Sequence, residues 1–367
     1  MAQNSNIQIE ENNKIISDPE KVGEIFNDFF INVASDIGTG ETPSGPEHPS
    51  IKAIKENNKV PPNSFSFVQV DQSKVEKYLK DIGTKKATGI DNVSSKILNL
   101  TSTVMIGPIT SLINSMIKNS TFPDTLKSAR ISPIFKKENP LERQNYRPVS
   151  ILPAVSKVFE RTISRQLDDY FSNIFHPFLS AYRSGYSCET VLLALTEEWR
   201  RALDRNHYVA AILMDLSKAF DCVPYDLLYD KLEAYGLDQN AVNLIKSYLT
   251  ERKQCVRVGS TNSCLKNIKK GVPQGSILGP TIFNIFVNDI FHFVKKSDLV
   301  NYADDNTLTF THSDINVLKK TLEDESNILI KWFKENKMRA NPDKFQEIAI
   351  GKKSVAENLS FNIGGIT

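Results

Sequence analysis

Three aspartates stand where the sequence predicts that strands end. Asp304 and Asp305 are adjacent within NYADDNTLTF, residues 301–310, between two short runs of strand-favouring residues. Taken alone, the pair fits the polar tip of a β-hairpin, because Asp and Asn favour turns. Asp215 lies 89 residues before Asp304 and closes the apolar run AAILMD. A charge at the end of a buried strand is costly unless a partner or a metal compensates it, so the three carboxylates suggest one shared site.

Convergent carboxylates predict a reaction that depends on a divalent metal. Mg²⁺ prefers oxygen ligands and leaves positions open for substrate phosphates. Two such ions about 3.5–4 Å apart stabilise the attacking and the leaving oxygen in phosphoryl transfer. We therefore predict nucleotidyl transfer with two Mg²⁺ ions, or Mn²⁺ in their place, held by Asp215, Asp304 and Asp305. Neighbouring strand residues point to opposite faces, so a tight turn is what would let Asp304 and Asp305 both approach one site. Of this pair, we expect Asp304 to bridge the ions with Asp215, and Asp305 to be the less direct ligand.

A glycine-rich loop lies between these aspartates in the sequence. GVPQGSILGP, residues 271–280, contains three glycines and two prolines and precedes the apolar helical stretch TIFNIFVNDIF. On its own, this is a loop followed by a helix. Because the free N–H groups at the start of a helix can also hold a phosphate, the segment is a second candidate site.

The elements that must position these residues are strands and helices. YVAAILMDLSKAF is a continuous apolar run too short for a typical helix, which predicts a buried strand. CVRVGSTNSCLKNI and LVNYADDNTLTF are typical of hairpins, and FQEIAIG is typical of a single strand. Helical patterns dominate from residue 70 to about 205, with VSKVFERTISRQLDDYF as an amphipathic example. A sheet interrupted by helices indicates an α+β fold.

The N-terminal part of the chain predicts a separate region. The first dozen residues are polar, and we expect them to be disordered. DPEKVGEIFNDFFINVASDI has apolar residues at helical spacing, with Asp18 placed as an N-cap. Residues 38–50, GTGETPSGPEHPS, have the composition of a flexible linker. A domain boundary is therefore expected near residue 65.

The composition excludes several classes of protein. The four cysteines form no C-x-x-C pair and the five histidines build no H-E-x-x-H helix, so structural zinc is not expected. The sequence has no run of 18 apolar residues and no basic, apolar signal sequence, so neither membrane spanning nor secretion is expected. Residues 127–165 hold nine Lys and Arg against three acidic residues. This segment could contact phosphates, although a solvated helix face is the commoner explanation for such charge.

Several motifs together resemble a known family. MDLSKAFD, GVPQGSILGP and YADD, in this order and at this spacing, resemble the palm motifs of reverse transcriptases. More narrowly, the chain resembles the polymerase domain of non-LTR (LINE-type, jockey-like) retrotransposons. Three further segments support the resemblance: KKATGIDNVSSKIL at 85–98, ISPIFKKENPLERQNYRPVSIL at 131–152 and WFKENKMRANPDKFQEIAIG at 332–351. The similarity extends over roughly residues 20–365.

The resemblance implies a fold and a domain order. The fold would be a right-hand polymerase fold of the α+β class, with helical, basic fingers, an antiparallel-sheet palm, and a thumb that is missing or incomplete. Residues 1–65 would form an N-terminal helix and a flexible linker, and residues 66–205 the fingers. Residues 206–367 would form the palm, including a helical segment at 276–294, and would end before the thumb.

The resemblance also implies roles for three residues that would select the nucleotide. Phe220 follows Asp215 by five positions, where the family keeps an aromatic gate against the sugar 2′-hydroxyl, the group that distinguishes RNA from DNA building blocks. Packing in the core is the alternative for Phe220. Gln274 would contact the incoming nucleotide or the template base, and Gly275 would let the backbone approach closely. The alternative for Gln274 is a solvent-facing turn.

Cationic residues match contacts with phosphates or with the template. Arg147, in NYRPVSIL, matches a fingers arginine that contacts the triphosphate, for which a planar donor fork is suited. Lys136 or Lys137 would assist it. Lys344 matches a lysine near the leaving pyrophosphate and could donate a proton to it. Arg183, in LSAYRSGYSCET, would contact the template, although this segment lacks the glutamine of the family pattern. For each lysine, a solvated surface charge is the alternative.

The implied function is that of an RNA-directed DNA polymerase, which adds deoxynucleotides to a primer 3′-hydroxyl. Its partners would be an RNA template, a DNA primer and dNTPs, with no membrane, and its location would be intracellular, in the nucleus, the cytoplasm or both. The first alternative is a truncated, inactive remnant that only binds nucleic acid. The second is an RNA-dependent RNA polymerase, which usually carries glycine before the paired aspartates; Ala303 and the bulky Phe220 count against it.

Overall fold

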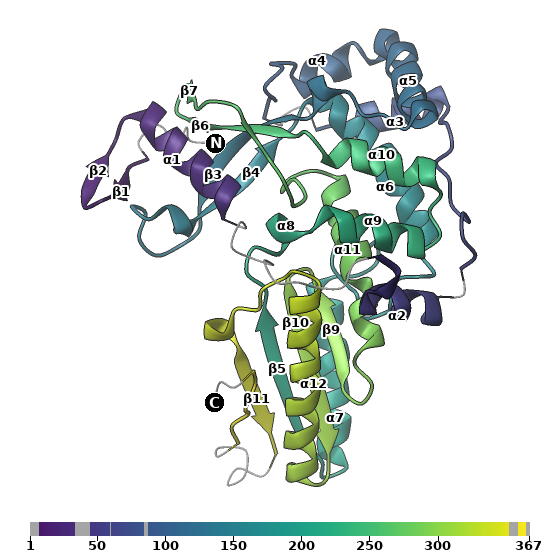
Figure 1. Ribbon diagram of the computed structural model, residues 1–367, viewed down its shortest axis with the longest axis vertical. Helices are drawn as coiled ribbons and strands as arrows, with labels where there is room; N and C mark the ends of the chain where they lie inside the picture. Colours follow the sequence, from purple (N-terminus) through teal and green to yellow (C-terminus); the bar gives the residue numbers. More distant parts are fainter. Residues whose placement is uncertain (1–6, 34–44, 59, 84–86, 352–358, 365–367) are drawn as a thin grey trace. The chain divides into compact units, whose positions relative to one another are not determined.

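The chain forms two compact units that interleave along the sequence (Figure 1). The computed structural model describes residues 7–33, 45–58, 60–83, 87–351 and 359–364. The first unit contains Met1–Asp36, Pro61–Tyr170 and Gly236–Thr281, and the second contains Ile37–Val60, Phe171–Tyr235 and Ile282–Thr367. These units differ in extent from the contiguous regions expected from the sequence. The assignment of fingers and palm therefore stays a prediction.

The first unit is built on a five-stranded sheet in the order β4-β3-β6-β7, with β8 also paired to β6. The strands are β3 (Ser128–Phe135), β4 (Tyr146–Ile151), β6 (Lys253–Val258), β7 (Thr261–Asn262) and β8 (Lys266–Asn267). β3 runs antiparallel to β4 and parallel to β6. The expected helical character of residues 66–205 is wrong for β3 and β4, because pairing with the distant strand β6 outweighs the local pattern.

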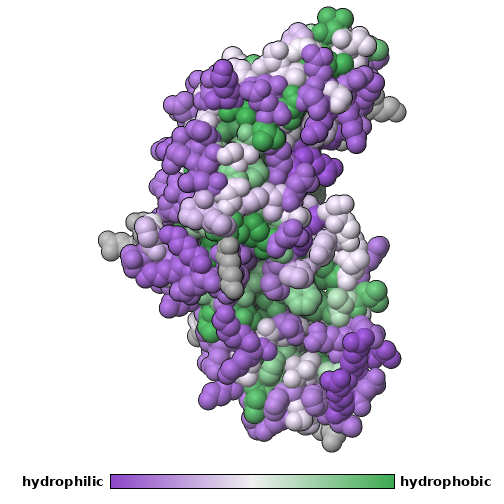
Figure 2. All heavy atoms as spheres, turned by 90° about the vertical axis from the view of Figure 1, so that its right-hand side faces the viewer, coloured by the Kyte–Doolittle hydropathy of each residue, from purple (hydrophilic) through white to green (hydrophobic). Residues whose placement is uncertain are grey.

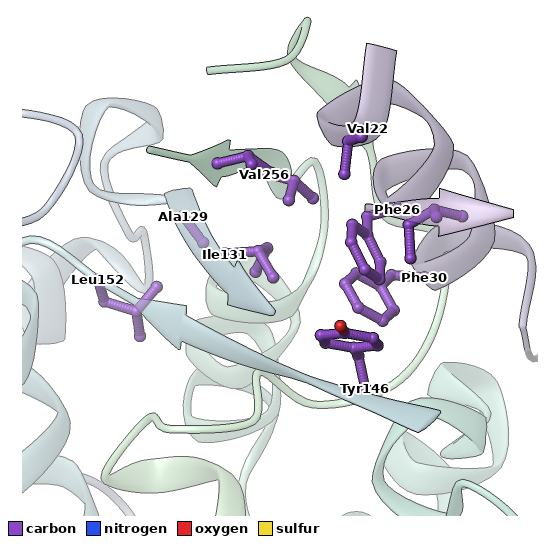
Figure 3. Packing of buried hydrophobic residues seen from close by; sticks show 10 residues of the cluster. Val22, Phe26, Phe30, Ala129, Ile131, Tyr146, Leu152 and Val256 are labelled. Carbon is purple, nitrogen blue, oxygen red and sulfur yellow. The ribbon is translucent and has the colours of Figure 1, made fainter. Parts of the chain in front are cut away.

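The N-terminal residues belong to the core of the first unit. β1 (Ile9–Glu11) and β2 (Lys14–Ile16) form an antiparallel hairpin, so the expected disorder is wrong for this segment. Helix α1 (Pro19–Asn32) follows, and the Asp18 carboxylate accepts a hydrogen bond from the Lys21 N–H, which confirms the N-cap. Figure 3 shows core residues from α1, from the sheet and from the position just after β4: Val22, Phe26, Phe30, Ala129, Ile131, Tyr146, Leu152 and Val256. Burial of each large apolar side chain contributes about 1.5–3 kcal/mol, so the sheet holds α1 in place.

Helices complete the first unit. They are α3 (Gln72–Asp81), α4 (Ser95–Leu100), α5 (Ser102–Asn119), α6 (Ala154–Phe171) and α10 (Gln239–Leu249), with short 3₁₀ turns at Asp124–Leu126 and Arg143–Asn145. α6 confirms the expected amphipathic helix. The rings of Phe122, Phe159 and Tyr248 pack together, with centroids 4.9 Å apart for the first pair and 5.2 Å apart for Phe122 and Tyr248. These contacts tie α6 and α10 to the segment after α5.

The second unit is built on a four-stranded antiparallel sheet in the order β11-β5-β10-β9. The strands are β5 (Tyr208–Asp215), β9 (Asp298–Tyr302), β10 (Asp305–His312) and β11 (Gln346–Ile350). Helix α12 (Ile315–Glu335) lies in front of this sheet in Figure 1 and α7 (Cys188–Asp204) lies behind it, so the two helices cover opposite faces. The buried strand, the β9–β10 hairpin and the final strand are all confirmed, as is the antiparallel sheet.

Shorter helices complete the second unit. They are α2 (Pro49–Asn57), α8 (Ala219–Cys222), α9 (Tyr225–Ala234) and α11 (Leu278–Val287), with 3₁₀ turns at Gly45–Glu47, Asn288–His292 and Pro342–Lys344. α11 begins within the first unit and confirms the helix expected after the glycine-rich loop. The expected linker is wrong for α2, whose Ile51 and Ile54 are buried and which packs on α9. The remainder of that linker, residues 38–44, lies outside the described residues.

The surface mixes hydrophilic side chains with separate apolar patches. On the face in Figure 2, hydrophilic residues predominate and the apolar ones gather in patches. Large exposed apolar residues include Leu100 and Val104 in the first unit and Leu192 and Leu193 on α7. In the described part of the chain, none of the helices has the length and apolar character that crossing a bilayer requires.

Candidate active site

Strand pairing brings two of the three aspartates face to face. β5 ends at Asp215 and β10 begins at Asp305, and these two residues are partners in the antiparallel register. Side chains of directly opposed residues share one face of the sheet, with Cβ atoms about 4.5–5.5 Å apart. Asp215 is therefore an immediate neighbour of Asp305 across the two strands. The ligand roles of the three residues stay a prediction.

Asp304 lies in the tight turn between β9 and β10. Tyr302 pairs with Asp305, so Ala303 and Asp304 form a two-residue loop. Ala303 has a φ of +59°, a conformation that costs a non-glycine residue about 1–3 kcal/mol and that is found preferentially at functional sites. This geometry confirms the hairpin expected from the turn residues. It also places Asp304 at the tip of the hairpin, beside the pair of opposed aspartates.

Two buried asparagines hold this turn, and the sequence reasoning missed them. The Asn301 side-chain amide donates to the Ala303 carbonyl at 2.9 Å and to Asn306 Oδ1 at 3.0 Å. The Asn306 amide in turn donates to the Asp304 carbonyl at 3.3 Å. Both side chains are at most 2% exposed. The signal available in the sequence was the position of one Asn on each side of YADD, within strands where Asn is otherwise disfavoured.

Lys344 forms an ion pair with the first aspartate. Its ammonium lies 2.7 Å from Asp215 Oδ2, and the Asp215 side chain is 23% exposed. The 3₁₀ turn Pro342–Lys344 is fixed nearby, because the Asn341 N–H donates to the Asp215 carbonyl. The structure thus places the sequence-predicted lysine directly at the carboxylate site.

The carboxylates fit a metal whose coordination is completed by substrate. Among the described residues, no group of three or more His, Cys, Asp or Glu side chains is arranged so that it could hold a metal ion. Asp215 and Asp305 nevertheless form an opposed pair, and the Lys344 ammonium already occupies a cation position at Asp215. Mg²⁺ commonly binds through one or two carboxylates plus substrate phosphates. The residues present therefore suit such an ion.

Phe220 is half-buried in a small aromatic cluster. Its ring stacks on Phe283 with centroids 4.3 Å apart, and Tyr182 meets it edge-on at 6.0 Å. Phe283 is fully buried, so one face of the Phe220 ring is packed and the ring is held in place. The packing given as the alternative for Phe220 is therefore present on one face of its ring, and its role as a gate stays a prediction.

The segment after α6 lies beside the aspartate hairpin, where Leu179 forms a β-bridge with Asn301. Within this segment, Arg183 contacts residues of the segment itself. The Arg183 guanidinium donates to the carbonyls of His176 and Leu179, both at 2.8 Å, and stacks over the Tyr186 ring. These contacts shape the loop that precedes α7. A contact between Arg183 and a template stays a prediction.

Cys188, at the start of α7, contacts the YADD segment. Its thiol hydrogen-bonds the hydroxyl of Tyr302, the first residue of YADD, and this bond raises the pKa of Tyr302. Cys188 therefore lies next to the hairpin that carries Asp304.

In the first unit, β3 and β4 carry the cationic candidates. Arg147 is opposite Ile134 in the β3–β4 register and is exposed. Its guanidinium makes no hydrogen bond or ion pair to the described part of the chain. Lys136 follows the end of β3, where its N–H donates to the Asn145 carbonyl, and Lys137 pairs with Glu138 at the surface. Arg147 is therefore available to an anionic ligand.

The glycine-rich loop lies against the end of β4. The Ser150 N–H donates to the Gln274 carbonyl at 2.7 Å. Gly275 has a φ of +103°, and a Cβ at this position would come within 2.8 Å of the Ser150 carbonyl oxygen. A close backbone approach is thus present between Gly275 and β4 of the same unit, and an approach of Gly275 to a nucleotide stays a prediction. The structure therefore brings Gln274 near the strand that carries Arg147.

Comparison with known proteins identifies the family. Residues 134–363 match the family described as Reverse transcriptase (RNA-dependent DNA polymerase). The probable RNA-directed DNA polymerase from transposon BS of Drosophila melanogaster is 31% identical over 72% of this chain and 30% of that protein. The corresponding enzyme from the mobile element jockey of the same species is 26% identical over 79% of this chain and 33% of that protein.

A further relative supports the same assignment. The probable RNA-directed DNA polymerase from transposon X-element of Drosophila melanogaster is 32% identical over 61% of this chain and 25% of that protein. The chain thus spans about a third of the length of these relatives or less. The family match includes Arg147, Asp215, Gln274, the aspartate hairpin and Lys344. The resemblance to polymerases of non-LTR retrotransposons is confirmed, and the chain belongs to the reverse transcriptase family.

Proposed function

We propose that this chain carries RNA-directed DNA polymerase activity, the template-directed transfer of nucleotides from dNTPs to a primer 3′-hydroxyl. The observation that carries the proposal is the register of β5 and β10, which opposes Asp215 to Asp305 with Asp304 in the adjoining turn. In a member of the reverse transcriptase family, carboxylates in this arrangement are suited to phosphoryl transfer.

The aspartates form the proposed catalytic centre. Asp215, Asp304 and Asp305 would hold two Mg²⁺ ions, or Mn²⁺, through their carboxylate oxygens. When bound, the ions would stabilise the charge on the attacking and leaving oxygens. Lys344 is assigned as the proton donor to the leaving pyrophosphate, and its ammonium, 2.7 Å from Asp215 Oδ2, supports this role.

Other residues would bind and select the nucleotide. Arg147 is assigned to the triphosphate with help from Lys136, because an exposed guanidinium that has no partner among the described residues suits phosphate oxygens. Gln274 and Gly275 are assigned to the nucleotide or template base. Phe220 is assigned as the gate against a 2′-hydroxyl, since stacking on Phe283 holds its ring in one place.

The proposed reaction defines the partners and the compartment. An RNA template, a DNA primer and dNTPs are the expected substrates, and Arg183 is the assigned template contact. Both nucleic acids are intracellular, so we place the activity in the nucleus, the cytoplasm or both.

A primer-extension assay tests the proposal. The full chain should extend a DNA primer on an RNA template with dNTPs and Mg²⁺, and Asp304→Ala should abolish extension. Asp324→Asn, which removes an exposed carboxylate of α12 in the same unit, is the matched control and should extend normally. Extension by rNTPs as efficient as by dNTPs would contradict the assignment and favour an RNA-dependent RNA polymerase. Phe220→Ala should increase rNTP incorporation.

A second candidate function is nucleic-acid binding without polymerisation. The ion pair of Lys344 with Asp215 favours it, because an ammonium bound to this carboxylate competes with a divalent ion. This alternative predicts that the chain binds a preannealed RNA–DNA duplex but does not extend it, even with Mn²⁺.

A further inference from the structure

A row of polar side chains on α6 contacts the exit of the glycine-rich loop. Ser156, Glu160, Ser164 and Asp168 follow one another at intervals of four residues, so they share one face of the helix. The first three are buried, and Glu160 is fully buried. A buried ionisable residue on an otherwise apolar face is costly unless it is well partnered. What these side chains contact therefore indicates what the row does.

Glu160 holds a backbone group of the loop. Its Oε2 accepts a hydrogen bond from the Ile277 N–H at 2.7 Å. Its Oε1 accepts from the hydroxyls of Ser156 at 3.0 Å and Tyr248 at 3.1 Å. Burial raises the pKa of the carboxyl group, while the Ile277 N–H and the nearby Arg252 oppose this shift. The carboxylate is thus oriented by two hydroxyls so that its other oxygen meets the loop.

Further along the helix, Ser164 and Asp168 contact Thr281 of α11 through side chains only. Thr281 Oγ1 lies 2.9 Å from Ser164 Oγ and donates to Asp168 Oδ1 at 3.1 Å. Asp168 therefore fixes a side chain near the start of α11, whereas Glu160 fixes the main chain of the loop itself.

The loop that carries Gln274 is clamped at two points. At one point the Ser150 N–H of β4 donates to the Gln274 carbonyl, and at the other Glu160 accepts from the Ile277 N–H. Between them, the Ser276 hydroxyl donates to the Pro273 carbonyl at 2.8 Å. A segment of four residues held at both ends has little freedom to change its main-chain conformation, which sets the position from which the Gln274 side chain extends.

We propose that Glu160 is a positioning residue that sets the conformation of the 274–277 loop and thereby the nucleotide contact of Gln274. The inference rests on the proposed function, in which Gln274 contacts the nucleotide or template base. Glu160 acts here through the Ile277 N–H and touches no substrate itself.

Three variants of the full chain separate positioning from general stability. Glu160→Met removes the acceptor for Ile277 and should raise the KM for dNTP about 10-fold, as expected for a small misplacement of a contact residue, with less change in kcat. Glu160→Gln keeps one acceptor oxygen and should restore the KM to within about threefold of wild type. Asp168→Asn, on the same helix face, is the matched control and should leave the KM unchanged.

Amide hydrogen exchange tests the same idea without relying on polymerase activity. Exchange at Ile277 should accelerate at least 10-fold in Glu160→Met and stay near wild type in Glu160→Gln. If Glu160→Met does not fold, Glu160→Asp replaces it, because the shorter side chain keeps the charge but loses the reach to Ile277. Unchanged Ile277 exchange and unchanged KM in a folded Met or Asp variant would overturn the proposal. If wild type extends no primer but Ile277 exchange responds as expected, the proposed function fails while the positioning of the loop by Glu160 stands.

Discussion

The two units fix their candidate site residues by different means. In the second unit, the aspartates are placed by main-chain pairing, since β10 pairs with β5 over the whole register from Asp305 with Asp215 to His312 with Tyr208. In the first unit, the Gln274 loop is placed by single hydrogen bonds, one donated by the Ser150 N–H to Gln274 and one accepted by Glu160 from Ile277. A ladder of many pairs tolerates the loss of one side chain, whereas a loop held at two points does not. A single substitution at the aspartates should therefore reduce catalysis and leave the hairpin folded. A single substitution at the loop contacts should change the loop conformation and reduce activity together.

Buried charge shows the same contrast. In the second unit, Lys231 and Asp289 are both 0% exposed and form an ion pair, and the Trp332 indole N–H donates to the other Asp289 oxygen. In the first unit, the buried Glu160 accepts from the Ile277 N–H, Ser156 and Tyr248, all neutral groups. A buried carboxylate paired with a cation is expected to hold the packing of its unit, whereas one paired with a loop N–H is expected to hold a conformation.

The largest expected effect is the loss of catalysis in Asp215→Asn. Metal-bound carboxylates support several kcal/mol of transition-state stabilisation, and each 1.4 kcal/mol corresponds to about tenfold in rate. Primer extension should therefore fall about 1,000-fold or more. The pair with Lys344 is partly exposed and worth about 0–1 kcal/mol, so the melting temperature should barely change. A large fall in the melting temperature would contradict the difference between the two units, because it would show that the hairpin depends on this side chain for its structure.

The next largest effect is the loss of stability in Lys231→Met. Removing one partner of a buried ion pair leaves an uncompensated charge, which costs about 3–5 kcal/mol. Urea denaturation should show this loss in the free energy of unfolding. The double variant Lys231→Met with Asp289→Asn removes the charge and keeps an acceptor for Trp332, so it should recover much of the loss. If the double variant recovers none of the free energy of unfolding, the stability of the unit requires the Lys231–Asp289 ion pair itself.

The Lys231 pair also predicts a pH dependence. Burial lowers the pKa of Lys231 to about 8 in the folded protein, compared with about 10.4 in an unfolded chain. Between these values the unfolded chain binds more protons, so the contribution of Lys231 makes the free energy of unfolding rise as pH rises. The difference in this free energy between wild type and Lys231→Met should therefore grow from about pH 8 to about pH 10.5. A difference that shrinks over this range would contradict the lowered pKa.

The elements with local signals could be predicted from the sequence. β5 is a short apolar run that ends at Asp215, the β9–β10 hairpin contains the turn residues Ala303 and Asp304, and α1 begins at its Asp18 cap. In each case, neighbouring residues carry the information, as period-two or helical spacing or as a cap. The family motifs lie on these elements, which is why Asp215 and the aspartate pair could be named in advance.

The elements that depend on distant partners could not be predicted. β3 is a strand because it pairs with β4 and with β6, and Ser128 meets Lys253 across that parallel pairing. α2 is stabilised by packing on α9, a contact that its own sequence does not reveal. Glu160 lies within the amphipathic helix expected from VSKVFERTISRQLDDYF, and only the fold shows that its carboxylate meets Ile277. Sequence spacing reports which face a residue is on, but not which distant segment covers that face.

A moderate effect is expected for Gly275→Ala. The backbone at Gly275 has a φ of +103°, and the added Cβ would meet the Ser150 carbonyl oxygen at 2.8 Å. The loop must shift, so we expect the KM for dNTP to rise about 10-fold and the protein to lose about 1–2 kcal/mol of stability. Gly185→Ala in the second unit is the matched control, because Gly185 has a φ of +83° but open space at its Cβ position. Its dNTP KM should stay at the wild-type value; an equal KM effect in both variants would show that the close approach to Ser150 is unimportant.

The smallest effect is expected for Ala303→Gly in the aspartate hairpin. A left-handed alanine costs about 1–2 kcal/mol, whereas glycine adopts this conformation freely. Glycine loses about 0.5–1 kcal/mol in chain entropy and also forfeits the burial of the Ala303 methyl group. These contributions nearly cancel, so the free energy of unfolding should change by less than about 1 kcal/mol. Ala303→Val, whose branched side chain resists a positive φ, should lose more.

Because Asn301 and Asn306 hold the turn through main-chain carbonyls, Ala303→Gly should also keep primer extension and the preference for dNTPs over rNTPs. The residue before the aspartates would then be set by the turn conformation, and sugar selection would be left to Phe220. A gain of rNTP incorporation in Ala303→Gly, measured beside Phe220→Ala, would instead assign part of the selection to the turn. It would show that a main-chain-paired region can be as sensitive to one side chain as the Gln274 loop.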